Sequence, residues 1–394
     1  MSKSTVIQKV KRRLRKTEPK QKFYSTENIN KKNATYNVIF GERSNGKTYA
    51  LLKQSLEEYL ETGNQMAYVR RWKEDITGRR AGQLYGGINE SGMIAELTNG
   101  EFTGVHYWAG KWYLCTYDDN GKVKYSDQDI IAYAFALSDG EHDKSTSFPN
   151  ITTIVFDEFL TSRTYLVNEF VFFMNTVSTI VRRRNNVRVY MLGNTVSKFC
   201  PYFGEMGLGN ITSMEQGKID VYRYGESPLT VAVEYCASHS GGVEVESNKY
   251  FAFNNPKLQM ITGGAWELDI YPHLPHKYKP HNVVFKYFID FNDNLFQCEV
   301  VDVNGVYFTY IHVKTTELKD TENDLIYSLD YDPRMNHNRS IFSPLNRLQE
   351  RVLWFFKADR VYYQSNDVGD TINNYLKVCR SGAWCMTTRT RSLT

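Results

Sequence analysis

The sequence of 394 residues lacks long hydrophobic runs, and no stretch comes near the roughly 18 consecutive apolar residues that a membrane-spanning helix needs. Its 6 cysteines include no C-x-x-C pair, which excludes a zinc knuckle and gives no indication of a disulfide framework. The N-terminus has no apolar core of the signal-peptide type. We therefore expect an intracellular protein with reduced cysteines and no membrane partner.

Acidic residues are scarce in one segment, the N-terminus. Residues 1–32 contain eleven Lys or Arg but only Glu18 and Glu27, whereas the whole chain has a net charge of +4, so the rest of the chain is net acidic. A block of like charges does not pack against itself and is typical of a mobile arm that binds an acidic partner, most often nucleic acid. We predict such a basic arm over residues 1–33. The alternative is a solvated tail that aids solubility.

From Thr35 onward, short β-rich runs alternate with amphipathic stretches, a pattern typical of an α/β fold. The length favours two domains, and we place the first at residues 34–225. A β insertion is predicted near 101–137, where aromatic residues alternate with turn residues. The strand candidates are 36–40, 66–70, 152–156 and 187–192, and the main helix candidate is 165–184.

The second half of the chain begins with a segment in which apolar residues show little helical or strand periodicity. Residues 226–280 are rich in Gly, Pro and polar residues and are predicted to form a connector. Residues 281–394 are predicted to form a second domain of α+β type. Its strand-like runs are 283–292, 295–303 and 306–313, and its helices are expected at 344–357 and 367–379.

One short segment carries a phosphate-binding pattern. Residues 41–48 fit G-x-x-x-x-G-K-[ST], directly after a predicted strand and before a helical run. Backbone N–H groups in such a loop surround phosphate oxygens, aided by the helix dipole. We expect Lys47 to neutralise the β- and γ-phosphates of ATP and Thr48 to bind Mg²⁺. The nucleotide-binding residues are then Gly41, Ser44, Asn45, Gly46, Lys47 and Thr48.

A second predicted strand ends in two acids. Asp157 and Glu158 follow an apolar run, so they emerge at the strand end where open α/β sheets bind ligands. Asp157 is expected to coordinate Mg²⁺ through water and Glu158 to polarise the attacking water. The sequence has neither an N-K-x-D nor an L-S-G-G-Q motif, and the glutamate after the aspartate favours ATP hydrolysis. Asn194, after the next strand, is placed to sense the γ-phosphate.

Basic residues lie at or just after the C-terminal ends of two predicted elements, the helix 165–184 and the strand 66–70. Arg182 begins a triple arginine at the end of the long helix, and Lys73 follows the strand 66–70. Cations at a helix C-terminus are stabilised by the dipole alone. The functional interpretation is an arginine finger that acts on the γ-phosphate of a neighbouring subunit.

These motifs together resemble the genome-packaging ATPases of small tailed phages with protein-primed, terminal-protein-linked double-stranded DNA. The resemblance implies a P-loop NTPase domain of the additional-strand catalytic-glutamate type and an RNase H-like C-terminal domain that no longer cuts DNA. Arg182 matches the trans-acting arginine of that family, and Lys73 matches a basic residue of the same interface. The matching stretches are 38–48, 68–73, 154–159, 187–197 and 201–203.

The resemblance also implies partners and a location. It predicts a homo-oligomeric ring, a pentamer by resemblance, that docks on the portal of an empty capsid and drives double-stranded DNA inward. Such a protein acts in the host cytoplasm, transiently at the portal vertex of the procapsid. Whether the basic arm replaces or contacts a packaging RNA stays open.

Three alternatives follow from the same residues. The first is a ring helicase or DNA-pumping ATPase of cellular type, and the second is a nucleic-acid-binding scaffold switched by ATP. In the third, Asp290 and Asp302 hold nuclease metals in the C-terminal domain, although surface acids at strand edges are the favoured interpretation.

Overall fold

The computed structural model describes residues 23–118, 120–139, 146–161, 165–166, 168–195, 200–237, 271–274, 277–291, 294–330 and 332–381. The chain divides into two compact units, each built on its own β-sheet. Within the described ranges, none of the helices has the length and hydropathy that a bilayer crossing requires. The predicted arm up to residue 22 and most of the predicted connector lie outside the described residues.

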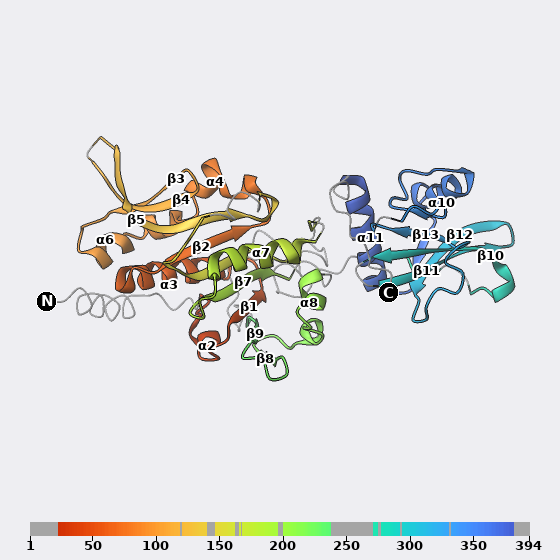
Figure 1. Ribbon diagram of the computed structural model, residues 1–394, viewed down its shortest axis with the longest axis horizontal. Helices are drawn as coiled ribbons and strands as arrows, with labels where there is room; N and C mark the ends of the chain where they lie inside the picture. The colour runs from red at the N-terminus through yellow and green to blue at the C-terminus, as the bar shows by residue number, and fades with distance from the viewer. Residues whose placement is uncertain are drawn as a thin grey trace, which may run out of the picture. The chain divides into compact units, whose positions relative to one another are not determined.

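The first unit contains a nine-stranded sheet of order β3-β4-β5-β2-β6-β7-β1-β9-β8 (Figure 1). Its six central strands, from β5 to β9, run parallel, whereas β3, β4 and β8 are antiparallel to their neighbours. This confirms the predicted α/β class. The strands are β1 (Tyr36–Gly41), β2 (Gln65–Arg70), β3 (Gly104–Trp108), β4 (Lys111–Tyr117), β5 (Val123–Ala136), β6 (Ile151–Asp157), β7 (Arg188–Asn194), β8 (Ile219–Arg223) and β9 (Thr230–Tyr235).

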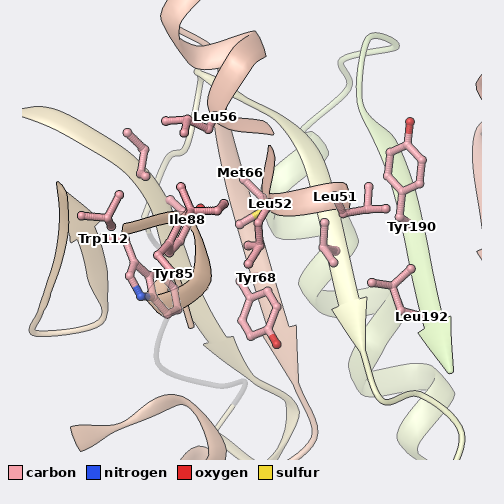
Figure 2. Packing of buried hydrophobic residues seen from close by; sticks show 14 of the residues in the cluster. Leu51, Leu52, Leu56, Met66, Tyr68, Tyr85, Ile88, Trp112, Tyr190 and Leu192 are labelled. Carbon is pink, nitrogen blue, oxygen red and sulfur yellow. The ribbon is translucent and has the colours of Figure 1, made fainter. Parts of the chain in front are cut away.

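Helices cover both faces of this sheet. Leu51 belongs to α3 and shares an apolar cluster with Val155 of β6 (Figure 2). The next residue of β6, Phe156, points to the opposite face, because side chains alternate along a strand; there its ring lies 4.9 Å from that of Phe173 on α7. The helices are α2 (Glu27–Asn30), α3 (Lys47–Thr62), α4 (Gly78–Gly82), α5 (Gly86–Glu90), α6 (Met93–Thr98), α7 (Glu169–Val181) and α8 (Pro201–Glu205).

The helix α7 is shorter than the sequence predicts. The apolar spacing predicted a helix over 165–184, but Asn168 and Arg182 both adopt left-handed backbone conformations, with φ of 57° and 39°. A left-handed residue ends a helix because it turns the chain away from the helix axis. Arg182 therefore lies in the turn after α7 and not on the helix.

Two predicted domain limits need correction. The predicted arm included residues 23–33, but Ile29 on α2 is fully buried in the core of the first unit. Tyr24 also donates its backbone N–H to the Asn45 carbonyl at 2.9 Å. The predicted connector began at 226, yet β9 pairs in parallel with β1 inside the main sheet. The first segment reads as polar, whereas β9 is a short β-rich run that was overlooked within a region rich in Gly, Pro and polar residues.

The predicted β insertion is present but is part of the main sheet. The strands β3 and β4 form an antiparallel pair, and β4 continues into β5. The strand β5 spans 14 residues, and its last five, 132–136, pair in parallel with β2. The insertion thus extends the sheet on the side away from β1.

The second unit contains a six-stranded sheet of order β14-β13-β10-β11-β12-β15. The three predicted strand-like runs form the antiparallel meander β10-β11-β12. Apolar side chains of α10 and α11 pack with one face of this sheet, giving an α+β arrangement. The elements are β10 (Val283–Phe291), β11 (Asn294–Val303), β12 (Val306–Val313), β13 (Leu325–Ser328), β14 (His337–Asn338), β15 (Val361–Tyr363), α10 (Arg347–Lys357) and α11 (Asn366–Ser381).

Candidate nucleotide-binding site

The phosphate loop connects the end of β1 to the start of α3. Gly46, directly before α3, has a φ of 88°, a conformation that glycine adopts without strain. At Gly41 a Cβ atom would lie only 3.0 Å from the Cβ of Cys236. Both glycines of the motif therefore have a local steric reason. The loop leads directly into the N-terminus of α3, the end of a helix that favours anions.

Strand order brings the separate motifs to one edge of the sheet. The strand β7 lies between β1 and β6. Gly41 is in register with Asn194, and Asp157 is in register with Leu192, two residues before Asn194. Because these strands are parallel, the phosphate loop, Asn194 and Asp157 all lie at the carboxyl ends of adjacent strands.

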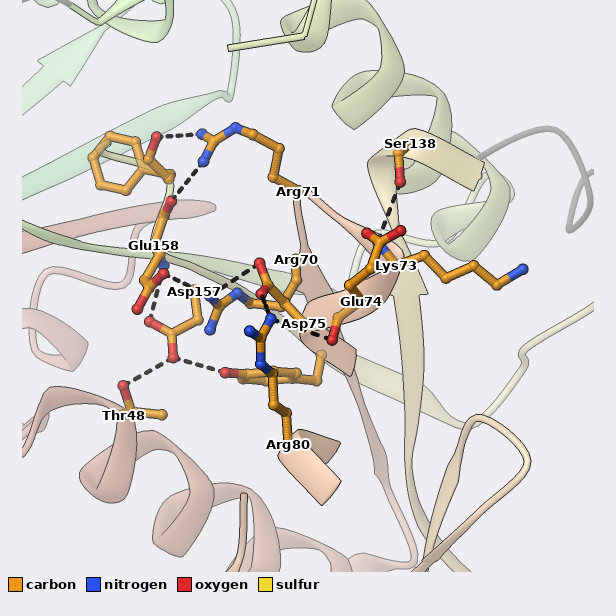
Figure 3. Close-up of polar contacts among 12 residues, drawn as sticks. Thr48, Arg70, Arg71, Lys73, Glu74, Asp75, Arg80, Ser138, Asp157 and Glu158 are labelled. Carbon is orange, nitrogen blue, oxygen red and sulfur yellow. Dashed lines mark hydrogen bonds and ion pairs between the residues drawn. The ribbon is translucent and has the colours of Figure 1, made fainter. Parts of the chain in front are cut away.

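Asp157 is bonded on both carboxylate oxygens. Thr48 Oγ1 donates to Oδ2 at 2.9 Å, and the Tyr68 hydroxyl donates to the same atom at 2.8 Å (Figure 3). The N–H of Glu158 donates to Oδ1 at 2.9 Å. Burial and the nearby Asp157 charge hold the pKa of Tyr68 well above its usual value, so its hydroxyl remains a donor. The Thr48 hydroxyl and the Asp157 carboxylate are hard oxygen ligands of the kind that Mg²⁺ binds together with phosphate oxygens.

Lys47 is buried at the centre of the loop. Its Nζ lies 2.6 Å from the Glu42 carbonyl, 3.1 Å from Asn45 Oδ1 and 3.3 Å from Asn194 Oδ1. Burial lowers the pKa of Lys47, because the charged form loses contact with water. All three acceptors are neutral, so an anionic phosphate would be a stronger partner for this ammonium group.

The backbone of Glu158 has a left-handed conformation, with a φ of 58°. Its carboxylate is 57% exposed and forms an ion pair with Arg70 at the end of β2. Arg70 also lies 3.4 Å from Asp75, so one guanidinium is shared by two carboxylates. In this arrangement the Glu158 carboxylate is engaged by Arg70.

The backbone behind Glu158 is held by a buried ion pair. Arg71 Nε and Glu169 Oε2 are 2.6 Å apart, and both side chains are almost completely buried. Arg71 also donates to the carbonyls of Glu158 and Phe159, at 3.2 and 2.8 Å. The Tyr202 hydroxyl donates to Glu169 Oε1 at 3.0 Å. This network joins β2, the Glu158 turn and the first turn of α7.

Sequence reasoning gave no role beside the acid pair to four of these side chains, Tyr68, Arg70, Arg71 and Glu169, although Arg70 and Arg71 belong with Lys73 to the basic run that closes the predicted strand. The signal for the first three was their place at the end of β2, next to the strand that ends in the acids. Glu169 carried no such signal. It lies in a helix whose other buried residues are largely apolar, and only the fold shows that it faces Arg71.

The two other predicted site residues lie elsewhere. Lys73 is exposed and forms an ion pair with Asp139 at 2.7 Å, and its side chain points away from Asp157 in Figure 3. Arg182 lies in the same turn as Arg184, which donates to the Pro149 carbonyl just before β6 begins. Asp157 is the last residue of that strand, so Asp157 lies about 20 Å from the start of β6, at ~3.3 Å per residue. Arg182 therefore lies at the opposite edge of the sheet from the phosphate loop of its own chain.

The paired acids of the second unit do not form a metal site. Asp290 is in register with Leu295 near one end of β11, whereas Asp302 lies near the other end of that strand. Seven residues along a strand separate them by about 23 Å, which is too far for one metal centre. This distance contradicts the alternative in which they hold nuclease metals together, and it agrees with the favoured interpretation of separate acids at strand edges.

Comparison with known proteins finds a family model that matches part of this chain. The family model described as podovirus DNA encapsidation protein (Gp16) matches residues 19–89 and 110–222. The two matched stretches, 71 and 113 residues long, cover just under half of the 394-residue chain. The resemblance to phage genome-packaging proteins seen in the motifs is thus confirmed.

Individual relatives match just under half of the chain. The DNA packaging protein of Bacillus phage B103 is 31% identical over 175 residues, 44% of this chain and 48% of the relative. That of Bacillus phage phi29 is 28% identical over 187 residues, 47% of this chain and 50% of the relative. The chain thus spans about half the length of the curated relatives it matches.

A solved structure is similar over most of the chain. The Phi-28 gp11 DNA packaging motor aligns with 94% of this chain and 100% of its own, with a TM-score of 0.54 and 19% identity. At that identity the likeness concerns the fold alone.

Proposed function

We propose that this protein is an ATPase that drives viral double-stranded DNA into an empty capsid. The observation that carries the ATPase assignment is the 2.9 Å contact between Thr48 of the phosphate loop and Asp157 of the acidic strand. It places the hydroxyl and the carboxylate that a nucleotide-bound Mg²⁺ needs within reach of one ion. The family and its relatives support DNA as the cargo.

Each residue of the site has a role in hydrolysis. Lys47 exchanges its neutral partners for the β- and γ-phosphates. Thr48 and Asp157 would hold Mg²⁺, which neutralises charge on the phosphates. Asn194 contacts the γ-phosphate, and Glu158, released from Arg70, orients the attacking water. The position of β7 between β1 and β6 supports the additional-strand type of P-loop ATPase.

The position of Arg182 supports a ring. Arg182 lies about 20 Å, by strand length, from the nucleotide site of its own chain. Arg182 therefore reaches ATP only in the site of a neighbouring subunit. An open hollow beside α7 is lined by the two arginines Arg182 and Arg183 together with Asn175, Ser178, Thr179 and Val181, so it offers positive charge to a phosphate-bearing neighbour. We assign Arg182 as the trans-acting arginine and place Lys73 at the same subunit interface. A pentamer follows from the resemblance.

The remaining assignments follow from the family resemblance. The ring docks at the capsid portal, in the host cytoplasm, and a packaging RNA is an open partner. The second unit is an RNase H-like domain without nuclease activity, which agrees with the separation of Asp290 and Asp302.

ATP turnover by the full chain tests the catalytic assignment. Lys47→Ala and Glu158→Gln should each lower the rate at least about 10²-fold, the usual contribution of a positioned general base or more. Glu90→Gln, an exposed glutamate at the end of α5, is the matched control and should keep the wild-type rate. Unchanged turnover in both site variants would contradict the assignment.

DNA translocation needs a separate assay. When the protein, ATP and portal-bearing empty shells are mixed, double-stranded DNA should become protected from added nuclease. Strand separation on a forked substrate without protection would favour the helicase alternative. Turnover that neither DNA nor shells stimulate would favour the ATP-switched scaffold.

A further inference from the structure

The three consecutive arginines that follow α7 lie in different surroundings. Arg182 and Arg183 are exposed and line the open hollow beside α7. Arg184 is half-buried, and all three nitrogens of its guanidinium group donate to backbone carbonyls of its own chain. While these bonds are formed, Arg184 does not extend toward a neighbouring subunit. The run of arginines therefore contains two outward groups and one inward group.

Arg184 connects the C-terminus of α7 to the turn that precedes β6. Its Nη2 donates to the Ile180 carbonyl at 2.7 Å and its Nε to the Val181 carbonyl at 3.3 Å, in the last turn of α7. Carbonyls in the last turn of a helix have no partner within the helix, and a cation there is stabilised by the helix dipole. On the other side, Nη1 donates to the Pro149 carbonyl at 2.7 Å and Nη2 to the Phe148 carbonyl at 3.1 Å.

The turn that precedes β6 is itself fixed to the sheet. Phe148 is buried, and its ring lies 5.2 Å from that of Tyr133 and 5.1 Å from that of Phe135, both on β5. The carbonyl of Asn150 accepts the backbone N–H of the first residue of β2 at 2.8 Å. Arg184 therefore bonds to a turn that packing and hydrogen bonds hold in place, and it sets the end of α7 relative to the sheet.

The backbone of the two outward arginines requires such support. Arg182 and Arg183 have φ values of 39° and 69°, so two successive residues with a Cβ atom are left-handed. Left-handed residues other than glycine are disfavoured sterically and usually occur singly. Two in succession persist only where the surrounding contacts fix them. The backbone N–H of Arg184 donates to the Val181 carbonyl at 2.9 Å, and its side chain bonds the same end of the helix. The direction in which Arg182 leaves the turn therefore depends on Arg184.

We propose that Arg184 is a positioning residue that orients Arg182 toward the ATP site of the neighbouring subunit. Arg184 contacts no nucleotide; it acts through the conformation of the turn that carries Arg182. A cationic group stabilises charge in the transition state most effectively when its position is fixed before the reaction begins. This inference rests on the proposed function, in which Arg182 acts in trans.

Steady-state ATP turnover by the full chain tests this role. Arg184→Met removes all four side-chain hydrogen bonds. Turnover should then fall about 10²-fold, the effect of misplacing a reacting group by about 1 Å. The KM for ATP should stay unchanged, because the phosphate loop of each chain is intact and the arginine acts in the transition state. Arg184→Lys keeps the charge at the helix end but not the planar fork, so its rate should lie between those of Arg184→Met and wild type.

A double variant distinguishes positioning from general structural support. Arg184→Met combined with Arg182→Ala should turn over ATP at the rate of Arg182→Ala alone, because no arginine is then left to position. A further loss in the double variant, of the same factor as in Arg184→Met alone, would overturn the inference. Such additivity is the result expected if Arg184 only stabilises α7.

Mixing of subunits locates the defect. In a mixture of Arg184→Met and Asp157→Ala proteins, the intact ATP site of the first meets the intact arginine turn of the second, and turnover should return in part. A mixture that stays as slow as its components, while Arg182→Ala mixed with Asp157→Ala regains turnover, would show that Arg184 supports the site of its own chain. The inference would then be overturned. The matched control is Arg223→Met, a change of an exposed arginine on the edge strand β8, which should keep the wild-type rate.

The outcomes separate the inference from the function on which it rests. A slow Arg182→Ala with an Arg184→Met as fast as wild type would overturn the inference and leave the proposed function standing. Full turnover in Arg182→Ala would overturn the trans-acting arginine and its positioning but not the ATPase assignment. A wild type without turnover would overturn all of these. Circular dichroism identifies a misfolded Arg184→Met, and Arg184→Lys with and without Arg182→Ala then decides by the same test of additivity.

Discussion

The buried pair between Arg71 and Glu169 provides a strong test of the site's architecture. Their side chains are 6% and 0% exposed, so Glu169→Gln leaves the Arg71 charge buried without its counter-ion. Removing one partner of a buried pair destabilises a protein by about 3–5 kcal/mol. Arg71 keeps two carbonyl acceptors, at Glu158 and Phe159, which places the expected loss near the lower limit. A loss of about 3 kcal/mol lowers the melting temperature of a unit of this size by roughly 10 °C.

A double-mutant cycle separates the pair from its surroundings. Thermal unfolding would be measured for wild type, Arg71→Met, Glu169→Gln and the double variant, with the exposed Glu90→Gln as control. The double variant should lose less than the sum of the single losses, by about 1 kcal/mol or more, because neither charge is then left alone. If Glu169→Gln stays within about 0.5 kcal/mol of wild type, as surface changes do, the pair does not hold the Glu158 turn.

Three further predictions concern other parts of the chain. Tyr68→Phe removes one of two donors from Asp157 Oδ2, and the Mg²⁺ concentration for half-maximal turnover should rise about 10-fold, as for other groups that orient a metal ligand. Arg182→Ala should lower turnover about 10³-fold or more, and mixing it with an Asp157→Ala protein should restore activity in a shared site. The pKa of Glu299 is lowered from 4.5 to about 2, chiefly by His312 and then by Tyr278. A carboxylate with a lowered pKa stabilises the fold above its unfolded pKa, so this contribution is lost as pH falls from 4.5 toward 2.

Each of these predictions has a contradicting result. An unchanged Mg²⁺ titration in Tyr68→Phe would show that Asp157 is oriented without the tyrosine. No rescue at any mixing ratio would count against Arg182 as a trans-acting group. Acid unfolding of the second unit should have a shallower pH dependence in Glu299→Gln than in wild type, and identical curves would exclude Glu299 as a source of that dependence.

The contiguous features of the site were readable before the fold was known. The phosphate loop lies within residues 41–48, and the acid pair directly follows an apolar strand, so a local pattern contains both. Alternation of β-rich and amphipathic runs predicted four of the parallel strands. The strand β9 carries a similar β-rich run but was missed because its surroundings are rich in Gly, Pro and polar residues; only the fold shows that it pairs with β1, almost two hundred positions earlier in the sequence.

Sequence by itself determined which groups this protein has for binding phosphate and metal, because backbone turns and strand ends are set by neighbouring residues. Tertiary structure alone decided which charges meet. Arg70 and Glu158 are 88 residues apart in sequence, and Arg71 and Glu169 are 98 apart, so only strand order brings them together. The parallel direction of the strands leaves Arg182, which precedes β7, at the end of the sheet opposite the phosphate loop. The physical reason is that ion pairs act over a few ångströms in space, whatever the distance along the chain.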